Sequence, residues 1–279
     1  MSSLDLRKGT FISIGTHRLL ATVSGVDRST DMGTFATILL YHRTGLGRSE
    51  DAPDPMIHRA TTAAQELQIL LTQAHLSPPY LVVGHSYGAI IAREFLHLCP
   101  QAVIGMVVAD GSTERQPELL QDPDLDLAAV QGDLSFARVT GLRTNAQLTR
   151  DEWRARARDI ARGRRTRAVE AGEMVEVCQT LGAKEQYRHQ ALGQKPLSVV
   201  RCRGSLDYRK IYEASVAAGN GSETQQKAFE RLFERWDGVD QAMQEDQLQL
   251  SSQSRLVYLE GCGHHIHLLR PEVIAEEVR

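Results

Sequence analysis

The chain has 279 residues, of which 42% are hydrophobic and 24% are charged, an ordinary composition for a protein that buries a full α/β core. Its formal net charge of −3 gives no reason to expect nucleic acid or an anionic membrane as a partner. No stretch approaches the ~20 apolar residues that cross a bilayer, and the N-terminus lacks the apolar run of a secretory signal. The four cysteines are widely spaced, which favours reduced thiols. We therefore expect a cytoplasmic protein.

The first predicted elements are an N-terminal hairpin, with strands at 9–14 and 18–23 joined by a tight turn. A buried-strand pattern follows at 35–41 and ends in a glycine-rich loop. The apolar periodicity of residues 58–75 predicts an amphipathic helix, which Pro78 ends.

The middle of the chain begins with a predicted strand at 80–83, followed by an apolar helix at 89–98 and a strand at 104–109. From 111 to 195 the strand rhythm disappears, and polar, arginine-rich helical patterns replace it. Arginine-rich stretches of this kind are more typical of a solvated helix face than of an anion site.

The strand rhythm returns at 196–200 and again at 255–259, on either side of a helical stretch at about 208–248. Pro271 is well placed in the first turn of a terminal helix. Short apolar strands that alternate with helices are typical of a mainly parallel sheet with helices on its faces.

These patterns together predict an α/β fold in two parts. Residues 1–110 and 196–279 are expected to form the sheet domain. Residues 111–195 are expected to form a helical cap that leaves the sheet at the carboxyl ends of its strands, where a cap limits substrate size and excludes water.

The strongest local signal is Gly-His-Ser-Tyr-Gly at 84–88, between a predicted strand and a predicted helix. A serine hydroxyl becomes a useful nucleophile only when it is exposed beside a base. A sharp strand-to-helix turn provides that exposure, and small residues on both sides allow it. The motif predicts Ser86 as the nucleophile and the backbone N–H of Tyr87 as one donor to the oxyanion.

The chain resembles the α/β-hydrolase superfamily, and it is especially similar to its small, esterase-like members. Besides the motif around Ser86, the resemblance rests on three segments in the order of the family. They are Tyr-His-Arg-Thr-Gly-Leu-Gly-Arg-Ser at 41–49, Val-Val-Ala-Asp at 107–110, and Gly-His-His-Ile-His-Leu at 263–268 with Pro271. The resemblance implies an α/β-hydrolase fold and a Ser-His-Asp triad.

In this family the general base follows the last strand, which implies His264 and leaves its neighbour His265 as a less favoured alternative. The acid that orients the base must lie at the carboxyl end of a strand near the nucleophile. The resemblance favours Asp110, and Asp207, after the strand near 197–201, stays open as the alternative acid.

A metal site is the competing interpretation of the histidine-rich ending, since Cys262 lies beside His264, His265 and His267. Metal sites with such ligands usually need a second ligand cluster elsewhere in the sequence. None is present at a fitting spacing, so we expect no metal and no other cofactor.

The chain departs from the family between Val23 and Phe35, where members usually have a third strand, an oxyanion loop and a helix. This interval is too short for all three, so the third strand and its loop are expected to be missing. Three explanations compete: a truncated gene model, an oxyanion site rebuilt with Gly25 or Val26, or weakened catalysis. His42 also replaces the aspartate of the family's Tyr-Asp-Arg segment.

The leading hypothesis is hydrolysis of an ester, thioester or lactone bond in a small metabolite through an acyl-enzyme. A second hypothesis is a binding protein that keeps the triad but turns over poorly. A third is a biosynthetic acyl-transfer or cyclisation enzyme that uses the same triad, because a fold alone does not fix a function. All three imply a small-molecule ligand, and none implies nucleic acid or a membrane as partner.

Overall fold

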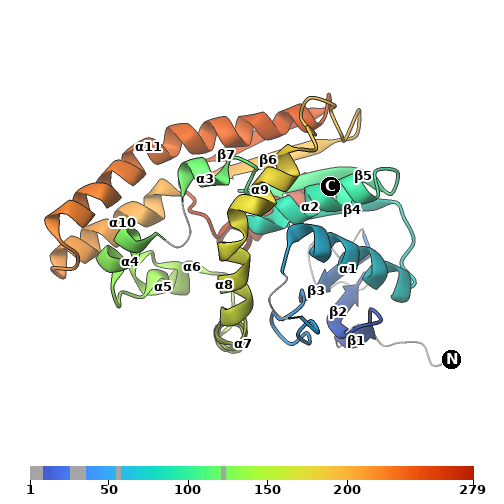
Figure 1. Cartoon of the computed structure of the whole chain (residues 1–279), viewed down its shortest axis with the longest axis horizontal. Helices are drawn as coiled ribbons and strands as arrows, with labels where there is room; N and C mark the ends of the chain where they lie inside the picture. Colours follow the sequence, from blue (N-terminus) through green and yellow to red (C-terminus); the bar gives the residue numbers. More distant parts are fainter. Residues whose placement is uncertain (1–8, 26–35, 55–57, 121–123) are drawn as a thin grey trace.

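The computed structural model describes residues 9–25, 36–54, 58–120 and 124–279, and within them the strands form two separate sheets (Figure 1). The smaller sheet is antiparallel, in the order β1 (Thr10–Ser13), β2 (Arg18–Ser24) and β3 (Ile38–Tyr41). The larger sheet is parallel, in the order β4 (Tyr80–His85), β5 (Val103–Ala109), β6 (Leu197–Cys202) and β7 (Ser254–Leu259). The predicted α/β class and mainly parallel sheet are confirmed.

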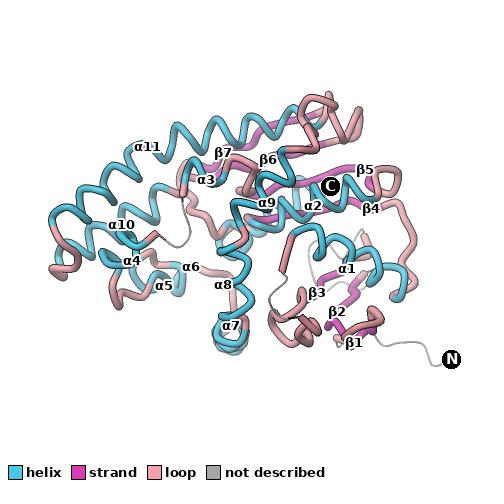
Figure 2. The backbone as a smooth tube through the Cα atoms, viewed as in Figure 1, coloured by secondary structure: helices cyan, strands magenta, loops and turns pink. Residues whose placement is uncertain are grey.

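Helices cover both faces of the parallel sheet (Figure 2). Successive residues of a strand point to opposite faces, and β5 shows this directly. Met106 and Val108 pack with α1 (Ala60–Gln73) and α2 (Tyr87–Leu98). Val107 and Ala109 pack on the other side, against α12 (Ile266–Leu269) and α13 (Pro271–Val278).

The segment between β5 and β6 is helical, and its described residues contain no strand. Its helices are α3 (Gln116–Leu119), α4 (Leu125–Gln131), α5 (Phe136–Val139), α6 (Leu142–Asn145), α7 (Arg150–Arg162), α8 (Arg164–Gly172) and α9 (Met174–Gly182). A capping box of Thr149 and Glu152 begins α7, since each side chain satisfies a backbone N–H of the first turn.

Two more helices follow β6, namely α10 (Ser205–Ala217) and α11 (Glu223–Gln247), with the short 3-10 helix η2 (Leu248–Leu250) after them. Both helices pack against α4, because Ile211 of α10 and Phe229 of α11 share a buried cluster with Val130 of α4. The helices beside the strand ends therefore come from two segments, one on each side of β6 (Figure 1).

The sheet is divided where the family's third strand was expected to be missing. Within the described residues β3 pairs only with β2, and β4 pairs only with β5. Leu40 of β3 is 62% exposed, and none of residues 36–41 is fully buried. The prediction that 35–41 is a buried strand is therefore wrong for its described residues, because no other described strand covers the second edge of β3. Residues 26–35, which contain most of the short interval, lie outside the described residues.

Helix α1 connects the two sheets through neighbouring parts of its surface. Leu70 and Ala74 pack with Ile12 and Leu19 of the antiparallel sheet. Leu71 packs in the main core with α2 and the parallel strands. The N-terminal sheet is therefore held by side-chain packing on α1 and by loop contacts, without strand pairing to β4. In the part of the chain that the structure describes, no helix has the length and apolar character of a membrane span.

Candidate active site

Ser86 occupies the sharp bend between β4 and α2. Its backbone has φ +52° and ψ −128°, a region that is strained for a residue with a side chain. The bend brings the backbone so close that a Cβ at Gly84 would lie 2.7 Å from the carbonyl oxygen of Gly88. A Cβ at Gly88 itself would meet nothing within 4 Å, so only the first glycine of the motif is sterically required here.

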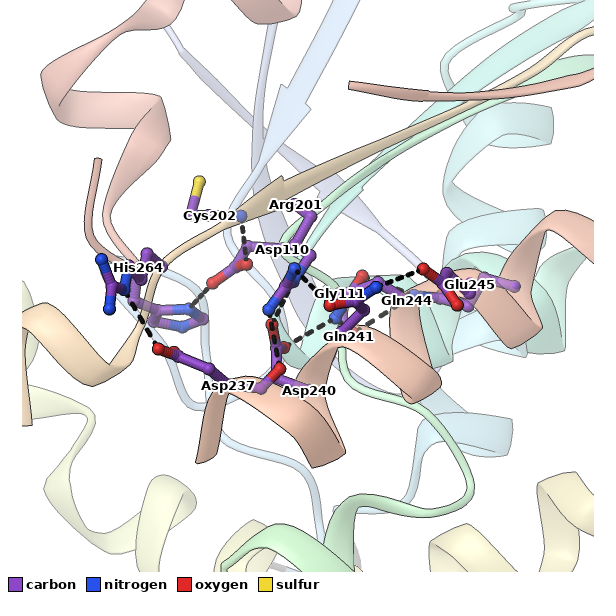
Figure 3. A network of polar contacts seen from close by, with 12 residues as sticks. Asp110, Gly111, Arg201, Cys202, Asp237, Asp240, Gln241, Gln244, Glu245 and His264 are labelled. Atoms are coloured by element: carbon purple, nitrogen blue, oxygen red, sulfur yellow. Dashed lines mark hydrogen bonds and ion pairs between the residues drawn. The ribbon is translucent and has the colours of Figure 1, made fainter. Parts of the chain in front are cut away.

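His264 and Asp110 are joined by a hydrogen bond between their side chains (Figure 3). The ring Nδ1 of His264 lies 2.6 Å from Oδ2 of Asp110. Because the carboxylate accepts from Nδ1, the other ring nitrogen, Nε2, is left free to accept a proton. The second oxygen of Asp110 accepts a hydrogen bond from the backbone N–H of Cys202 at 2.8 Å, which fixes the orientation of the carboxylate.

Asp207, the alternative acid, lies close to His264 but contacts its backbone. Its Oδ2 accepts the N–H of His264 at 3.2 Å, and the ring of His264 is bonded to Asp110 instead. His265, the alternative base, packs edge-on against Phe136 with ring centroids 5.7 Å apart. The structure therefore brings Asp110 and His264 together as a pair, and it gives Asp207 the different task of holding the loop.

The pair shifts the pKa values of both members in opposite directions. Burial alone would raise the pKa of Asp110, but the hydrogen bond from His264 and its charge bring it below the usual range. Burial alone would lower the pKa of His264, but the hydrogen bond to Asp110 and the negative charge there raise it. The site thus favours the imidazolium that forms when His264 takes a proton.

His85, the second residue of the motif, is a neighbour that sequence reasoning did not assign. Its Nε2 lies 2.7 Å from the backbone carbonyl oxygen of His264, and a carbonyl only accepts, so Nε2 carries the hydrogen. Its ring packs against the rings of His264 and His267, with centroids 4.7 and 4.3 Å away. Burial, together with the charge of His264, lowers the pKa of His85 to about 4, which keeps this ring neutral.

A polar network ties α11 to the strand ends behind the triad (Figure 3). Arg201 of β6 donates from Nε to Asp240 at 2.8 Å and from Nη2 to the carbonyl of Asp237 at 2.8 Å. Gln244 donates to the carbonyl of Gly111, the residue after Asp110, at 3.0 Å. These bonds connect α11 to β6 and to the residue that follows Asp110.

A cavity of about 390 Å³ contains Ser86, Asp110 and His264. Trp236 and Tyr208 line it with rings that contact each other at a tilt of 33°, with centroids 4.4 Å apart. The other large apolar side chains in its wall are Leu119, Leu120, Phe136, Met174 and Met243. Such a mainly apolar cavity with a few converging polar groups is typical of a small-molecule site.

The two predicted oxyanion donors lie in different places. Tyr87 is the first residue of α2, so its N–H has no acceptor within the helix and lies beside Ser86. Gly25 lies against Thr37, where an added Cβ would be 2.6 Å from the Thr37 Cα, and it is not among the residues that line the cavity. Gly25 follows β2 and lies near the start of β3. The structure therefore does not bring Gly25 to Ser86.

The loop after β3, residues 42–49, contacts α8 through two side-chain interactions. Arg43 forms an ion pair with Glu170 of α8, and the hydroxyl of Thr166 donates to the carbonyl of Gly45 at 3.1 Å. His42 accepts the backbone N–H of Arg48 at 2.8 Å through Nδ1. His42 therefore closes the loop through an acceptor atom, as the carboxylate expected at that position could.

No group of three or more metal-ligating side chains occurs among the described residues. The four histidines near Ser86 contact one another and Asp110 through rings and hydrogen bonds. Burial lowers the pKa of His265 and of His267 to about 3.

The model of the Alpha/beta hydrolase family matches residues 19–277. The chain belongs to this family. A curated relative, an AB hydrolase superfamily protein of Gibberella zeae, is 30% identical over 253 residues, which cover 87% of this chain and 76% of that protein. The family assignment agrees with the strand-bend-helix geometry around Ser86.

Two further comparisons bear on this hydrolase-family chain. A probable transporter, efuK, of Hormonema carpetanum is 27% identical over 305 aligned residues, which cover 98% of this chain but only 42% of that protein. Because 305 exceeds the length of this chain, that relative carries residues that have no counterpart here. The solved structure of Est816, an N-acyl homoserine lactone degrading enzyme, has a TM-score of 0.53 and 17% identity and covers 97% of this chain and 99% of its own. At this identity the likeness concerns the fold.

Proposed function

We propose that this protein is a serine hydrolase that cleaves an ester, thioester or lactone bond of a small molecule. The observation that carries the proposal is the hydrogen-bonded pair of His264 and Asp110 in the same cavity as Ser86. The apolar wall suits an uncharged acyl chain or ring next to the reacting carbonyl. Est816, which has a similar fold, is an N-acyl homoserine lactone degrading enzyme, so this fold can accommodate a lactone substrate.

The proposed reaction proceeds in two steps, acylation of Ser86 and hydrolysis of the acyl-enzyme. His264 takes the proton of the Ser86 hydroxyl through Nε2 while the oxygen attacks the carbonyl carbon, and the carbonyl oxygen becomes an oxyanion beside the N–H of Tyr87. The oxyanion collapses, the bond to the leaving group breaks, and the leaving group receives the proton from His264. Water then attacks the acyl-enzyme in the same way and releases the carboxylic acid and free Ser86.

The test is the turnover of a short series of p-nitrophenyl esters, a matched thioester and a γ-lactone by the wild type and by Ser86→Ala. We expect an initial burst of p-nitrophenol with at least one ester, because an acyl-enzyme that is released slowly accumulates. We expect the Ser86→Ala variant to show neither burst nor turnover. Turnover that survives this substitution would contradict the proposal.

A second candidate function is ligand binding with little turnover. The observation that favours it is the position of Gly25, away from the cavity, since loss of one oxyanion donor typically costs 100- to 1000-fold in rate. Tight binding of a substrate analogue that survives Ser86→Ala, with no measurable hydrolysis by the wild type, would support this candidate instead.

A further inference from the structure

The acidic side chains that line the cavity have partners of their own. Asp110 is paired with His264, Glu170 with Arg43, and Asp240 with Arg201. Asp207 accepts the backbone N–H of His264, and burial raises its pKa. These carboxylates therefore have interactions within the protein, and among the described residues none of them forms an ion pair with an arginine of α7 or α8.

Arg167 of α8 differs from the other arginines near the cavity. It lines the cavity together with Ser86 and His264. Its Nη2 donates to the backbone carbonyl of Ile160 at 2.7 Å, and it forms no ion pair with a carboxylate of the described residues. Its exposed guanidinium therefore keeps hydrogen-bond donors for a group that enters the cavity mouth.

Arg156 of α7 carries a second positive charge. It is not among the residues that line the cavity, but its helix packs against α8, the helix of Arg167. Arg156 is half-buried and stacks on Trp153, with its guanidinium carbon 5.1 Å from the ring centroid. Burial and the nearby charge of Arg167 lower the pKa of Arg156. Arg156 also lies near His265 and His267, whose rings stay neutral, and no ion pair joins it to a carboxylate among the described residues. Two neighbouring guanidinium groups repel each other unless an anion lies between them.

We propose that Arg156 and Arg167 bind an anionic group, a carboxylate or phosphate, at the end of the substrate that lies away from the scissile bond. This inference rests on the proposed function, and it narrows the substrate class to esters, thioesters or lactones with a negatively charged tail. Guanidinium groups suit this task because they present several N–H donors in a planar fork to two oxygens at once.

The test compares two esters that differ only at the far end of the acyl chain, mono-p-nitrophenyl adipate and p-nitrophenyl hexanoate. The measured quantity is the ratio of their kcat/KM values. We expect the wild type to prefer the adipate ester about tenfold or more, the size of effect that charge-assisted hydrogen bonds give at a partly exposed site. We expect Arg167→Gln and Arg156→Gln each to reduce this ratio several-fold, and 0.5 M salt to reduce it as well.

The matched control is Arg158→Gln, because Arg158 is exposed on α7 two residues from Arg156 and therefore lies on another side of the helix. Its ratio should equal that of the wild type. An unchanged ratio in Arg167→Gln and Arg156→Gln, or a wild type that prefers the hexanoate ester, would overturn the inference.

A separate binding measurement distinguishes failure of this inference from failure of the proposed function. If neither these two esters nor the ester series, thioester and γ-lactone of the first test are turned over, the proposed function fails, and calorimetry with adipate still tests the anion site. Weaker adipate binding in the folded Arg167→Gln variant supports the site, and equal or undetectable binding in both proteins overturns it. The same titration with inorganic phosphate shows which anion the site prefers.

Discussion

Replacement of Asp110 by asparagine is the perturbation that tests the geometry of the candidate triad in most detail. Asp110 accepts two hydrogen bonds with two oxygens, one from the ring of His264 and one from the backbone of Cys202. Asparagine has one oxygen and one NH₂ group. The backbone donor is fixed by β6, so the remaining oxygen is expected to stay with Cys202, and the NH₂ group then faces Nδ1 of His264.

This arrangement reverses the tautomer of the base. Nδ1 becomes the acceptor, Nε2 carries the hydrogen, and His264 can no longer take the proton of Ser86. An Asp→Asn change at the corresponding place of a serine-protease triad lowers kcat about 10⁴-fold, and we expect a loss of about 10³- to 10⁴-fold here. The acid limb of the pH profile should also move to lower pH, because the charge that raises the pKa of His264 is gone.

The assay is kcat/KM for the best p-nitrophenyl ester, with Asp207→Asn as the matched control. In that variant the amide oxygen can still accept the N–H of His264, so we expect less than a tenfold loss. Circular dichroism and thermal unfolding check that both variants are folded. The reverse pattern, with a large loss in Asp207→Asn and a small one in Asp110→Asn, would refute the assignment of the acid.

Three further outcomes follow from named contacts. Because the pKa of His264 is raised, wild-type kcat/KM should fall as the pH decreases through a midpoint above the ordinary histidine value of about 6.5, and a lower midpoint would contradict the pairing. His85→Leu removes the donor to the His264 carbonyl and should lower kcat about tenfold with little change in KM. His85→Gln keeps a donor and should recover much of the lost kcat. Equal losses of kcat in the two variants would argue against a positioning role for His85. Leu70→Ala should lower the free energy of unfolding in urea by about 2–5 kcal/mol, because this fully buried side chain joins α1 to the antiparallel sheet. The control Ile69→Ala, at a 40% exposed position, should lower it by less than about 1 kcal/mol.

The succession of strands and helices along the chain and the bend at Ser86 could be predicted because they depend on local patterns. The predicted strand at 80–83 and helix at 89–98 enclose the motif, and the structure has β4 and α2 there. The glycines around Ser86 were expected to be equally necessary, but only Gly84 is crowded. Close backbone approach depends on the path of neighbouring segments, which a five-residue motif does not specify.

The pairing of groups far apart in sequence could be narrowed but not resolved from the sequence. Asp110 and Asp207 both follow strands of the parallel sheet, so position alone left both open. The structure distinguishes them by atoms, since Asp110 contacts the ring of His264 and Asp207 its backbone. The bond from His85 to His264 spans 179 residues, and no sequence signal pointed to it.

The division of the sheet was partly visible in the sequence. The short interval before Phe35 predicted a missing strand, and the described strands are indeed in two sheets. The sequence did not show that α1 would hold these sheets together, or that α10 and α11 would pack with α4. Such packing depends on which apolar faces meet in space, and an amphipathic pattern alone does not name the partner of a face.

The central claim concerns the reactivity of Ser86, and covalent labelling measures it most directly. A fluorophosphonate probe should add one label per folded chain at Ser86, located by mass spectrometry of the labelled peptide, and the rate of labelling should fall in Asp110→Asn. Ser86→Ala should take up no label. A folded wild type that stays unlabelled, or a label found on another residue, would contradict the account.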